Sequence, residues 1–252
     1  MQAQEHYGRD FYEQRYAATR VAAEIVLGLL FSRLPGLRTV VDFGCGVGTW
    51  LKAAESLGAD DVLGIDGPWV ERDLLVIPQQ RFAQAVLPEV DLGDRRFDLA
   101  ISLEVAEHLH PEQADRFVDL LCAGADLILF SAAVPGQPGT GHVNCQWPAY
   151  WADKFARHGY VCLDIVRPRI WQTRDIPYFY QQNTLVYVNQ LDQHTLHTLS
   201  ALHNWCPDGE LPWELVHRDL YEHVLGSQQS LSATWKQLRR HIKRRLGMGT
   251  QS

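Results

Sequence analysis

The amino-acid sequence predicts an α/β fold built on a mainly parallel sheet. Short apolar runs of strand length alternate with segments of helical length from residue 39 onward. A glycine-rich turn at 44–48 follows the first of these runs. The 252 residues are 46% hydrophobic and 21% charged, an ordinary composition for a globular chain with one sizeable core. This length fits one large domain with an appendage better than two independent domains.

The first predicted element is a helix over residues 10–34, where apolar side chains recur near the helical period and Pro35-Gly36 ends the segment. Strands and helices then alternate. Helices joining strands in this way form βαβ units, so we expect their sheet to be parallel. We predict buried strands at 39–43, 61–66, 97–103 and 126–132, a short apolar piece at 81–87, and helices at 49–57 and 112–122.

The pattern changes after a loop at 135–141 that contains glycine and proline. A helix is predicted over 148–158. The apolar segments 161–171 and 183–189 then follow each other, and we predict two consecutive strands with no helix between them. Such a pair is antiparallel and closes one edge of the sheet. The remaining residues, 190–252, are mostly helical and polar.

These elements divide the chain into three parts. We expect an N-terminal helical cap (1–38), a sheet domain (39–189) and a C-terminal helical extension (190–252).

Charge and cysteine usage narrow the class of protein. The formal net charge of −7 gives no overall attraction to nucleic acid, so no stable nucleic-acid partner is expected. The basic run at 236–245 is interpreted as a solvated helix face, with contact to anionic lipid as the alternative. The five cysteines are scattered, without a C-x-x-C pair, which is typical of reduced thiols in the cytoplasm.

Neither targeting nor membrane insertion is indicated. The first 16 residues are polar and charged, unlike a secretory signal. The longest apolar run, at 21–31, contains a glutamate and is too short to span a bilayer, so no transmembrane segment is expected. We therefore expect a cytoplasmic protein, and a homodimer is left open.

The strongest signal is the segment VVDFGCGVGTW at 40–50. Glycines here let the chain turn tightly and let a ligand approach without a Cβ in the way, and the helix that follows offers free amides. The second strand ends in Asp66, whose carboxylate suits both hydroxyls of an adenosine ribose. The loop lacks the third glycine of a dinucleotide fingerprint, and no Gly-Lys-Ser/Thr follows. A ligand with a ribose and an amino-acid tail, but no pyrophosphate, fits best.

The D-x-G-x-G-x-G loop, the acidic end of the second strand and FDLAISLEVAEHL at 97–109 resemble motifs of class I S-adenosylmethionine-dependent methyltransferases, over about residues 40–135. The resemblance implies a methyltransferase with a Rossmann-like, seven-stranded sheet and S-adenosylmethionine as cofactor. It places the methionine moiety at Asp42 and the loop, the ribose at Asp66 and the adenine beside Gly67 and Trp69. The implied cofactor residues are Asp42, Gly44, Cys45, Gly46, Gly48, Asp66, Gly67, Trp69, Val86 and Leu103.

One position departs from the family pattern. Many relatives carry an Asp-Leu pair after the third strand, which bonds the adenine amino group, whereas this chain has Ala85-Val86. The adenine would then rely on backbone groups.

Carboxylates and imidazoles gather after two predicted strands. If a helix begins after residue 103, the spacings of three and four put Glu104, Glu107 and His108 on one face, at the carboxyl end of the sheet. His142 follows the next strand, and the four side chains are candidates to hold a divalent ion such as Mg or Mn. The pattern resembles the Glu-x-x-Glu-His plus distant His of metal-dependent O-methyltransferases, including small-RNA 2′-O-methyltransferases.

A metal-free alternative stays open for the same residues. Glu-His is common at this place in class I methyltransferases that bind no ion, where the glutamate caps the helix or touches the cofactor. His108 or His142 would then be the general base, because an imidazole titrates near neutral pH. The catalytic candidates are His142, His108 and Glu104.

The segment 139–187 is rich in aromatic and polar side chains. Aromatic faces among amide and guanidinium donors suit a sugar, although each ring alone fits a core position as well. The motifs GHVNxQW and IW…YxQN resemble bacterial methyltransferases of polysaccharide and glycan synthesis, such as the mycobacterial methylmannose-polysaccharide O-methyltransferases. The side chains concerned are Trp147, Tyr150, Trp151, Trp171, Tyr178 and Tyr180, among Asn144, Gln146, Arg169, Gln181 and Asn183.

We therefore expect a sugar or oligosaccharide acceptor that is methylated on a hydroxyl. The alternatives are a small natural product, an RNA 2′-hydroxyl, and a non-catalytic protein that binds the cofactor.

Overall fold

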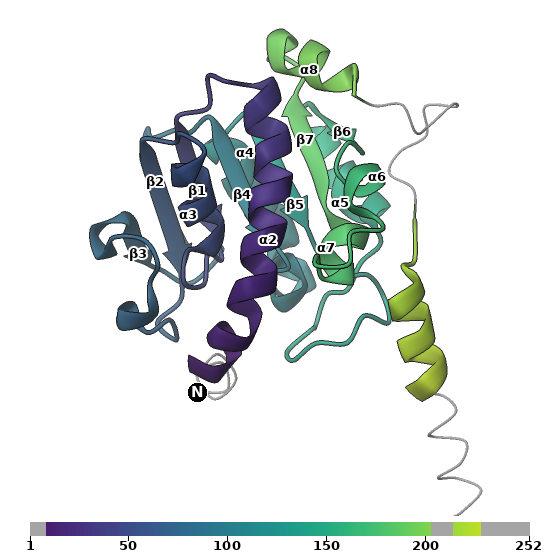
Figure 1. Ribbon diagram of the computed structural model, residues 1–252. Coiled ribbons are helices and arrows are strands. Elements are labelled where there is room, and N and C mark those ends of the chain that lie inside the picture. The colour runs from purple at the N-terminus through teal and green to yellow at the C-terminus, as the bar shows by residue number, and fades with distance from the viewer. Residues whose placement is uncertain (1–8, 203–213, 228–252) are drawn as a thin grey trace, which may run out of the picture. The chain divides into compact units, whose positions relative to one another are not determined.

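The computed structural model describes residues 9–202 and 214–227 (Figure 1). The chain divides into two compact units, residues 1–215 and 216–252. The described part of the second unit contains a helix at 218–227, in which Arg218 Nε donates to Glu222 Oε1 at 2.8 Å. The basic run at 236–245 and the helices predicted beyond residue 227 lie outside the described residues.

Seven strands form one sheet in the order β3-β2-β1-β4-β5-β7-β6. The first five strands are parallel, and β7 is antiparallel to both β5 and β6. This arrangement confirms the predicted fold class, including the antiparallel edge pair. The strands are β1 (Thr39–Phe43), β2 (Asp61–Asp66), β3 (Phe82–Gln84), β4 (Leu99–Leu103), β5 (Leu127–Ser131), β6 (Tyr160–Leu163) and β7 (Leu185–Asn189).

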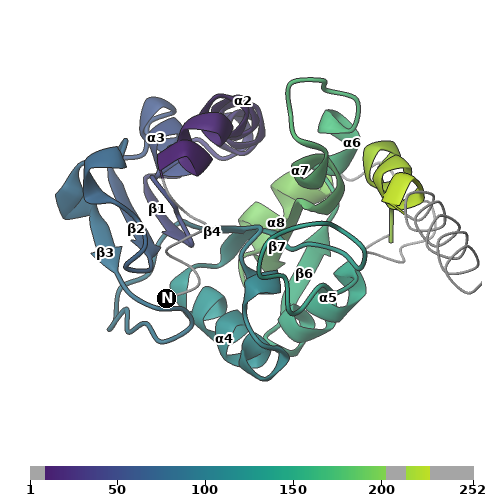
Figure 2. The ribbon, with the colours of Figure 1, turned by 90° about the horizontal axis from the view of Figure 1, so that it is seen from below.

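Helices cover both faces of the sheet (Figure 2). On one face, Leu27 and Leu51 join a core with Ile101 of β4; on the other, Phe117 and Phe155 pack with Phe130 of β5. The parallel strands all end at the edge seen in Figure 2, where ligands bind in open α/β sheets. The main helices are α2 (Arg9–Arg33), α3 (Thr49–Ser56), α4 (Ala114–Gly124), α5 (Pro148–Arg157) and α8 (Gln193–Ser200).

The predicted N-terminal helix is confirmed as α2. Within the described ranges, four short 3-10 turns precede β3 or α4: η1 (Arg72–Leu74), η2 (Gln79–Arg81), η3 (Ala106–His108) and η4 (Pro111–Gln113). None of the helices in the described ranges is long and apolar enough to cross a membrane.

The segment 161–171 differs from the prediction of one long strand. The strand β6 ends at Leu163, and two short helices, α6 (Arg167–Ile170) and α7 (Tyr178–Asn183), lie between β6 and β7. The strand ends where polar side chains begin to pair: Asp164 and Arg167 form a buried ion pair across one helical turn, with Nε–Oδ1 at 3.0 Å. Apolar periodicity alone did not show this local ion pair.

Candidate active site

The glycine loop between β1 and α3 has the backbone that its sequence predicts. Gly44, Gly46 and Gly48 have φ values of 86°, 54° and 87°, in the left-handed region that favours glycine. A Cβ on Gly44 would lie 2.4 Å from Cγ2 of Val105, which follows β4. Glycine is therefore required here both by the backbone and by the close approach of the neighbouring strand end.

Asp66 ties this loop to the end of β2. Its Oδ2 accepts from the Gly46 amide at 2.7 Å, and its Oδ1 accepts from the Gly67 amide at 2.6 Å. Burial raises the pKa of Asp66, although these two amides and the Trp69 side chain act against the rise. A Cβ on Gly67 would lie 2.2 Å from the Trp69 ring, so Gly67 lets the indole lie against the backbone. The structure thus brings four of the predicted cofactor residues together: Gly46, Asp66, Gly67 and Trp69.

The other predicted cofactor residues differ in their surroundings. Asp42 is buried, its Oδ2 has no hydrogen-bond partner, and burial with the nearby Asp66 charge raises its pKa well above the usual range. Cys45 is buried, and burial raises the pKa of its thiol in the same way. Leu103 is buried at the end of β4, whereas Val86 is 54% exposed.

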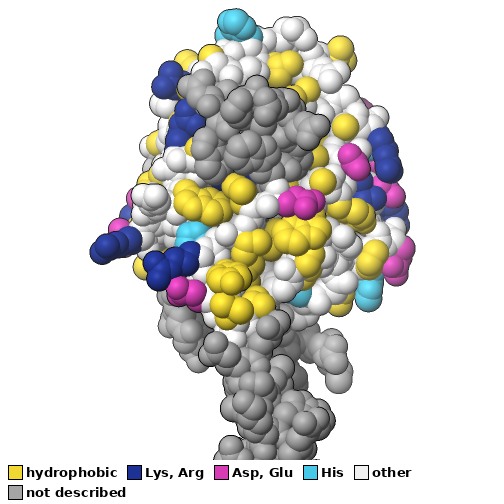
Figure 3. Space-filling view, turned by 90° about the vertical axis from the view of Figure 1, so that its right-hand side faces the viewer, with side chains coloured by type: hydrophobic (Ala, Val, Ile, Leu, Met, Phe, Trp, Pro, Cys, Tyr) yellow, Lys and Arg dark blue, Asp and Glu magenta, His cyan; other side chains and the backbone are white. Residues whose placement is uncertain are grey.

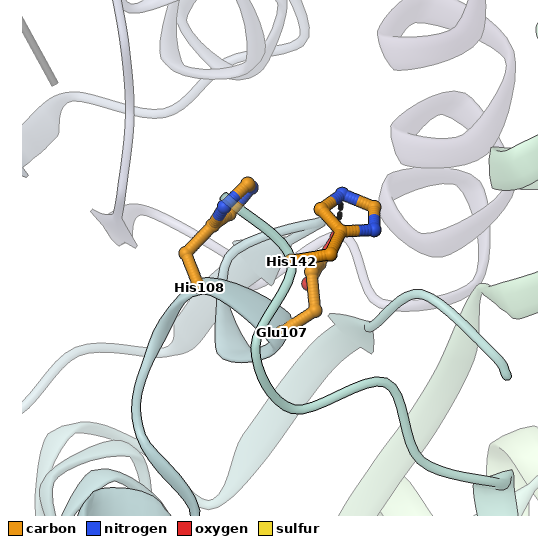
Figure 4. Close-up of side chains that lie close together, drawn as sticks. All are labelled: Glu107, His108 and His142. Carbon is orange, nitrogen blue, oxygen red and sulfur yellow. Dashed lines mark ion pairs between the residues drawn. The ribbon is translucent and has the colours of Figure 1, made fainter. Parts of the chain in front are cut away.

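Three of the four predicted metal ligands lie together. Glu107 and His108 belong to the 3-10 turn η3 (Ala106–His108), and His142 belongs to the loop between β5 and α5 (Figure 4). One ligand atom from each lies within 4.8 Å of the others. The amides of Val143 and Asn144 both donate to the Glu107 carbonyl, at 2.9 and 3.0 Å, and so fix the loop on the turn.

Glu107 is the most unusual group of this cluster. Its side chain is wholly buried, and among the described residues neither carboxylate oxygen has a hydrogen-bond partner of good geometry, although the backbone amides of Glu107 and Ala133 act to lower its pKa. The ring of His142 lies across the cluster, with its Nε2 3.9 Å from Oε1 of Glu107. Burial, with the Glu104 charge as a second cause, raises the pKa of Glu107 well above the usual range. A buried carboxylate in this state is costly unless a cation or proton joins it.

The contacts of the two imidazoles suggest which nitrogens carry protons. Nδ1 of His108 lies 3.3 Å from the Gly141 carbonyl, which can only accept, so this nitrogen is the donor and Nε2 is unprotonated in the neutral ring. Nδ1 of His142 lies 3.5 Å from Sγ of Cys145, while its Nε2 lies toward Glu107. A Cβ on Gly139 would lie 2.0 Å from His142 Nε2, so the loop passes directly against this ring.

Glu104, the fourth predicted ligand, lies in a different environment. The predicted helix after β4 is absent: Glu104 has a φ of 58°, and its amide donates to Ser131 O and Oγ, both at 3.0 Å. This bonding to β5 replaces the first helical turn, so the three side chains do not share a helix face. The Glu104 carboxylate instead accepts from Gln137 Nε2 at 2.6 Å and Asn183 Nδ2 at 3.0 Å. Sequence reasoning missed Gln137, because a glutamine in a loop carries no motif.

The aromatic segment divides between core and surface. Trp151 is 2% exposed and packs on Phe130, so it is a core residue. Tyr180 is buried and meets Trp50 of α3 edge-on, with ring centroids 5.4 Å apart. Trp171 lies partly exposed in a surface pocket of about 400 Å³, whose lining consists of Pro168, Arg169, Trp171, Gln172 and Thr173.

Comparisons with known proteins concern the fold and the sheet domain. Residues 12–129 match the family model described as a methyltransferase domain. The search among curated proteins gave no match.

Three solved structures of low sequence identity share the fold. An O-methyltransferase family protein from Burkholderia thailandensis has 15% identity and a TM-score of 0.52; the match covers 71% of this chain and 58% of that one. A sugar N-methyltransferase from a Streptoalloteichus species has 18% identity and a TM-score of 0.52, with 72% and 92% covered. An amino pentose methyltransferase from Micromonospora echinaspora has 14% identity and a TM-score of 0.51, with 71% and 96% covered.

The seven-stranded sheet and the glycine loop agree with the match of residues 12–129 to a methyltransferase domain, which covers 118 of the 252 residues.

Proposed function

We propose that the protein transfers a methyl group from S-adenosylmethionine to a hydroxyl of a sugar or glycan, assisted by a divalent cation at Glu107, His108 and His142. The observation that supports the cation is the state of Glu107, which is wholly buried next to two imidazoles and has no hydrogen bond of good geometry to its carboxylate within the described ranges. A carboxylate placed in this way needs positive charge, and the loop beside it provides no lysine or arginine.

The donor would lie over the ends of β1 and β2. Asp42 and the loop Gly44–Gly48, with Cys45 and Leu103, would hold the methionine moiety, because a buried carboxylate oxygen without a partner suits its ammonium group. Asp66 would accept from the ribose hydroxyls. Gly67, Trp69 and Val86 would line the adenine side, and the 54% exposure of Val86 makes it the outermost of them.

The three side chains of the cluster fit a cation such as Mg or Mn. One carboxylate and two neutral imidazoles are mixed oxygen and nitrogen ligands, and three protein ligands leave coordination positions for an acceptor. A bound divalent cation would lower the pKa of an acceptor hydroxyl, which is otherwise a poor nucleophile at neutral pH. The hydrogen bond from His108 Nδ1 to Gly141 fixes the tautomer that ligation requires.

The chain's own groups would also guide the proton. The acceptor oxygen forms its bond to the methyl carbon as the bond from carbon to sulfur breaks, and the hydroxyl proton must leave. Without a cation, His142 is the candidate base, because the neighbouring Glu107 carboxylate stabilises its protonated form. The metal-assisted and the histidine-base mechanisms therefore use the same residues and differ in their response to chelator.

Several observations support a sugar as the acceptor. The rings of Trp171 and Tyr178 lie near α6 and α7, partly exposed among polar side chains. Two of the proteins with this fold are described as sugar or amino pentose methyltransferases. On the face drawn in Figure 3, Lys and Arg side chains lie in small separate groups rather than as a continuous basic surface, which is unfavourable for RNA. A small natural product with a sugar-like hydroxyl stays the alternative acceptor.

We further propose that the enzyme acts in the cytoplasm. The four cysteines in the described ranges are free thiols, which supports the cytoplasm. A homodimer stays open.

An acceptor screen tests the proposal. Purified protein is incubated with methyl-labelled donor and a panel of monosaccharides and oligosaccharides, with EDTA or with added Mg²⁺ or Mn²⁺. We expect labelled sugar, loss of turnover in EDTA and recovery with one of the ions, while calorimetric donor binding survives chelation. Full turnover in EDTA would eliminate the cation and leave the histidine base, and labelling of RNA or of a non-sugar alone would overturn the sugar acceptor.

A further inference from the structure

Glu104 belongs to a closed set of hydrogen bonds outside the cation cluster. Its Oε2 accepts from Gln137 Nε2 at 2.6 Å, and its Oε1 accepts from Asn183 Nδ2 at 3.0 Å. The same Asn183 nitrogen donates to Gln137 Oε1 at 2.9 Å, so each of the three side chains is bonded to the other two. We call this set the carboxamide ring, formed by Glu104, Gln137 and Asn183.

The carboxamide ring joins three segments that are distant in sequence. Glu104 follows β4, Gln137 lies in the loop that carries His142, and Asn183 ends α7. Gln137 and Asn183 are buried, at 7% and 3% exposure, so these bonds form largely out of water, where an unmade bond is costly. The proposed cation loop and the aromatic segment of α6 and α7 therefore meet at one ionic group.

Further hydrogen bonds hold Asn183 in place on the side away from Glu104. Gln182 Nε2 donates to Asn183 Oδ1 at 2.9 Å, and Arg167 Nη1 donates to the Gln182 carbonyl at 3.3 Å. Arg167 is itself fixed by its buried pair with Asp164. Asn183 thus has both of its amide hydrogens directed at the ring and its oxygen bonded to Gln182.

The backbone of Glu104 supports a special role. A non-glycine residue with a φ of 58° is uncommon, and such strain is retained where surrounding contacts determine the conformation. Here the contacts are the two bonds from its amide to Ser131 and the two bonds to its carboxylate. The strain directs the carboxylate to the two carboxamides.

We propose that Glu104, Gln137 and Asn183 are positioning residues, which lock the His142 loop and α7 onto the end of β4 and so set the acceptor side of the site against the donor. Glu104 then acts as the ionic centre of the carboxamide ring and not as a ligand of the cation. The consequence for acceptor turnover rests on the proposed function, whereas the locking of the two segments can be measured without an acceptor.

The donors around Glu104 suggest a charge-relocation test. In the wild type, the NH₂ groups of Gln137 and Asn183 both donate to the Glu104 carboxylate. In Glu104→Gln, an NH₂ group takes the place of one carboxylate oxygen, so one of these two donors faces another donor. In the double variant E104Q/Q137E, the side chain at position 104 is a carboxamide and the side chain at position 137 is a carboxylate. The carboxamide NH₂ at 104 can donate to the carboxylate at 137, and the Asn183 NH₂ can donate to the oxygens of both. The ring closes again with one negative charge, although that charge has moved to the other loop.

Hydrogen exchange measured by mass spectrometry provides the first readout. We expect Glu104→Gln to raise the exchange rate of peptides covering 135–146 and 178–183 by about tenfold or more, because both segments lose an anchor. The strands should stay protected and calorimetric donor affinity should stay within about twofold. E104Q/Q137E should return exchange to near the wild-type rate. Gln181→Ala is the matched control, since Gln181 lies on α7 but bonds to the Thr173 and Ile176 carbonyls; it should leave 135–146 unchanged.

The second readout is Mn²⁺ binding, measured by electron paramagnetic resonance. Glu104→Gln should weaken Mn²⁺ binding by less than about tenfold, whereas Glu107→Gln should abolish it. With a sugar acceptor from the screen, Glu104→Gln should lower kcat and raise the acceptor KM together, and E104Q/Q137E should recover most of both.

Two results would overturn the inference. One is unchanged exchange at 135–146 in Glu104→Gln; the other is abolished Mn²⁺ binding in that variant with no rescue by E104Q/Q137E, which would make Glu104 a ligand. If the wild type binds no Mn²⁺, the proposed cation site is wrong, but hydrogen exchange still tests whether the carboxamide ring holds the two segments. Should Glu104→Gln not fold, Gln137→Leu removes one member of the ring from the loop and is expected to give the same loosening.

Discussion

Asp66 and Glu107 are buried carboxylates with opposite surroundings: Asp66 ends β2, and Glu107 lies on the turn that follows β4, the strand on the other side of β1. Asp66 accepts two short bonds from the amides of Gly46 and Gly67, so its position is determined before any ligand arrives. Among the described residues, Glu107 has no hydrogen bond of good geometry on either oxygen, and the His142 ring lies 3.9 Å from its Oε1. The proposed donor side is therefore preorganised by its own backbone, whereas the proposed acceptor side contains a buried carboxyl group whose ionised form is unfavourable until a ligand joins it.

The largest expected effect comes from removing the Glu107 charge. Glu107→Gln should lower cation-dependent turnover by more than about 100-fold, because a neutral amide is a poor ligand for a divalent ion. The same change should raise the melting temperature by roughly 2–4 °C, equal to about 1 kcal/mol, since an unpartnered buried charge is lost. Steady-state kinetics and calorimetry measure the two effects. A lower melting temperature would show that the carboxylate already has a stabilising partner.

The pH dependence of stability gives a check on the same residue. Because the pKa of Glu107 is raised in the folded state, the unfolded chain loses this proton near the ordinary carboxyl pKa and the folded chain only at higher pH. Between these two values the folded state binds more protons, so the free energy of unfolding contributed by this group falls as pH rises. Glu107→Gln should remove this part of the slope, as measured by denaturant unfolding at several pH values.

The second prediction tests the donor side. Asp66→Ala should weaken donor binding by about 2 kcal/mol, roughly 30-fold, because a charge-assisted contact to the ribose and an anchor of the loop are lost together. Asp60→Ala is the control, since Asp60 lies beside the opposite end of β2 and its side chain is 75% exposed. Calorimetric titration with the donor measures both. Equal affinity in the two variants would mean that the ribose is held elsewhere.

The same contrast explains what could be predicted from the sequence. The proposed donor side consists of two short local features: the spacing of Gly44, Gly46 and Gly48 predicted the backbone of the loop, and the predicted second strand ended at Asp66, as β2 does. The strands β1 and β2 were predicted to the residue. Local pattern was sufficient, because each of these features depends on neighbours in the chain.

The acceptor side could be predicted only in part. His142 was placed near Glu107 because both follow parallel strands, and the structure brings them together. The conformation of Glu104 depends on Ser131, Gln137 and Asn183, which are far away in sequence, so helical spacing predicted the wrong face. The helix α6 was missed for a similar reason, since it forms around a buried ion pair within an apolar segment that reads as a strand.

A third prediction compares two glycines, one on each side. Gly139→Ala would put a methyl group 2.0 Å from His142 Nε2, and Gly64→Ala would put one 2.7 Å from Cys45 Sγ; neither position needs a left-handed backbone. We expect Gly139→Ala to lower kcat by about tenfold with donor affinity unchanged, because small displacements of a reacting group are costly. Gly64→Ala should instead weaken donor binding. Matching kinetic effects in the two variants would show that the sides are not independent.

The smallest expected effect concerns Cys145, whose sulfur lies 3.5 Å from Nδ1 of His142. Burial raises the pKa of this thiol, with the charges of Glu107 and Glu104 as further causes, so it stays neutral near pH 8 and should react slowly with iodoacetamide. A neutral sulfur is a weak hydrogen-bond partner for an imidazole, so Cys145→Ala should lower kcat by only about threefold. Cys145→Ser should recover part of this loss, because a hydroxyl can form a hydrogen bond with the same nitrogen of His142. Cys122→Ser is the control, since Cys122 lies on α4, on the helical layer beside the sheet and away from the loop, and its thiol pKa is about 12. Steady-state kinetics at several pH values measure these losses of kcat. If the loss in Cys145→Ala equals that in Glu107→Gln, the thiol itself takes part in the chemistry. The acceptor side would then depend on Cys145 as much as on the Glu107 carboxylate.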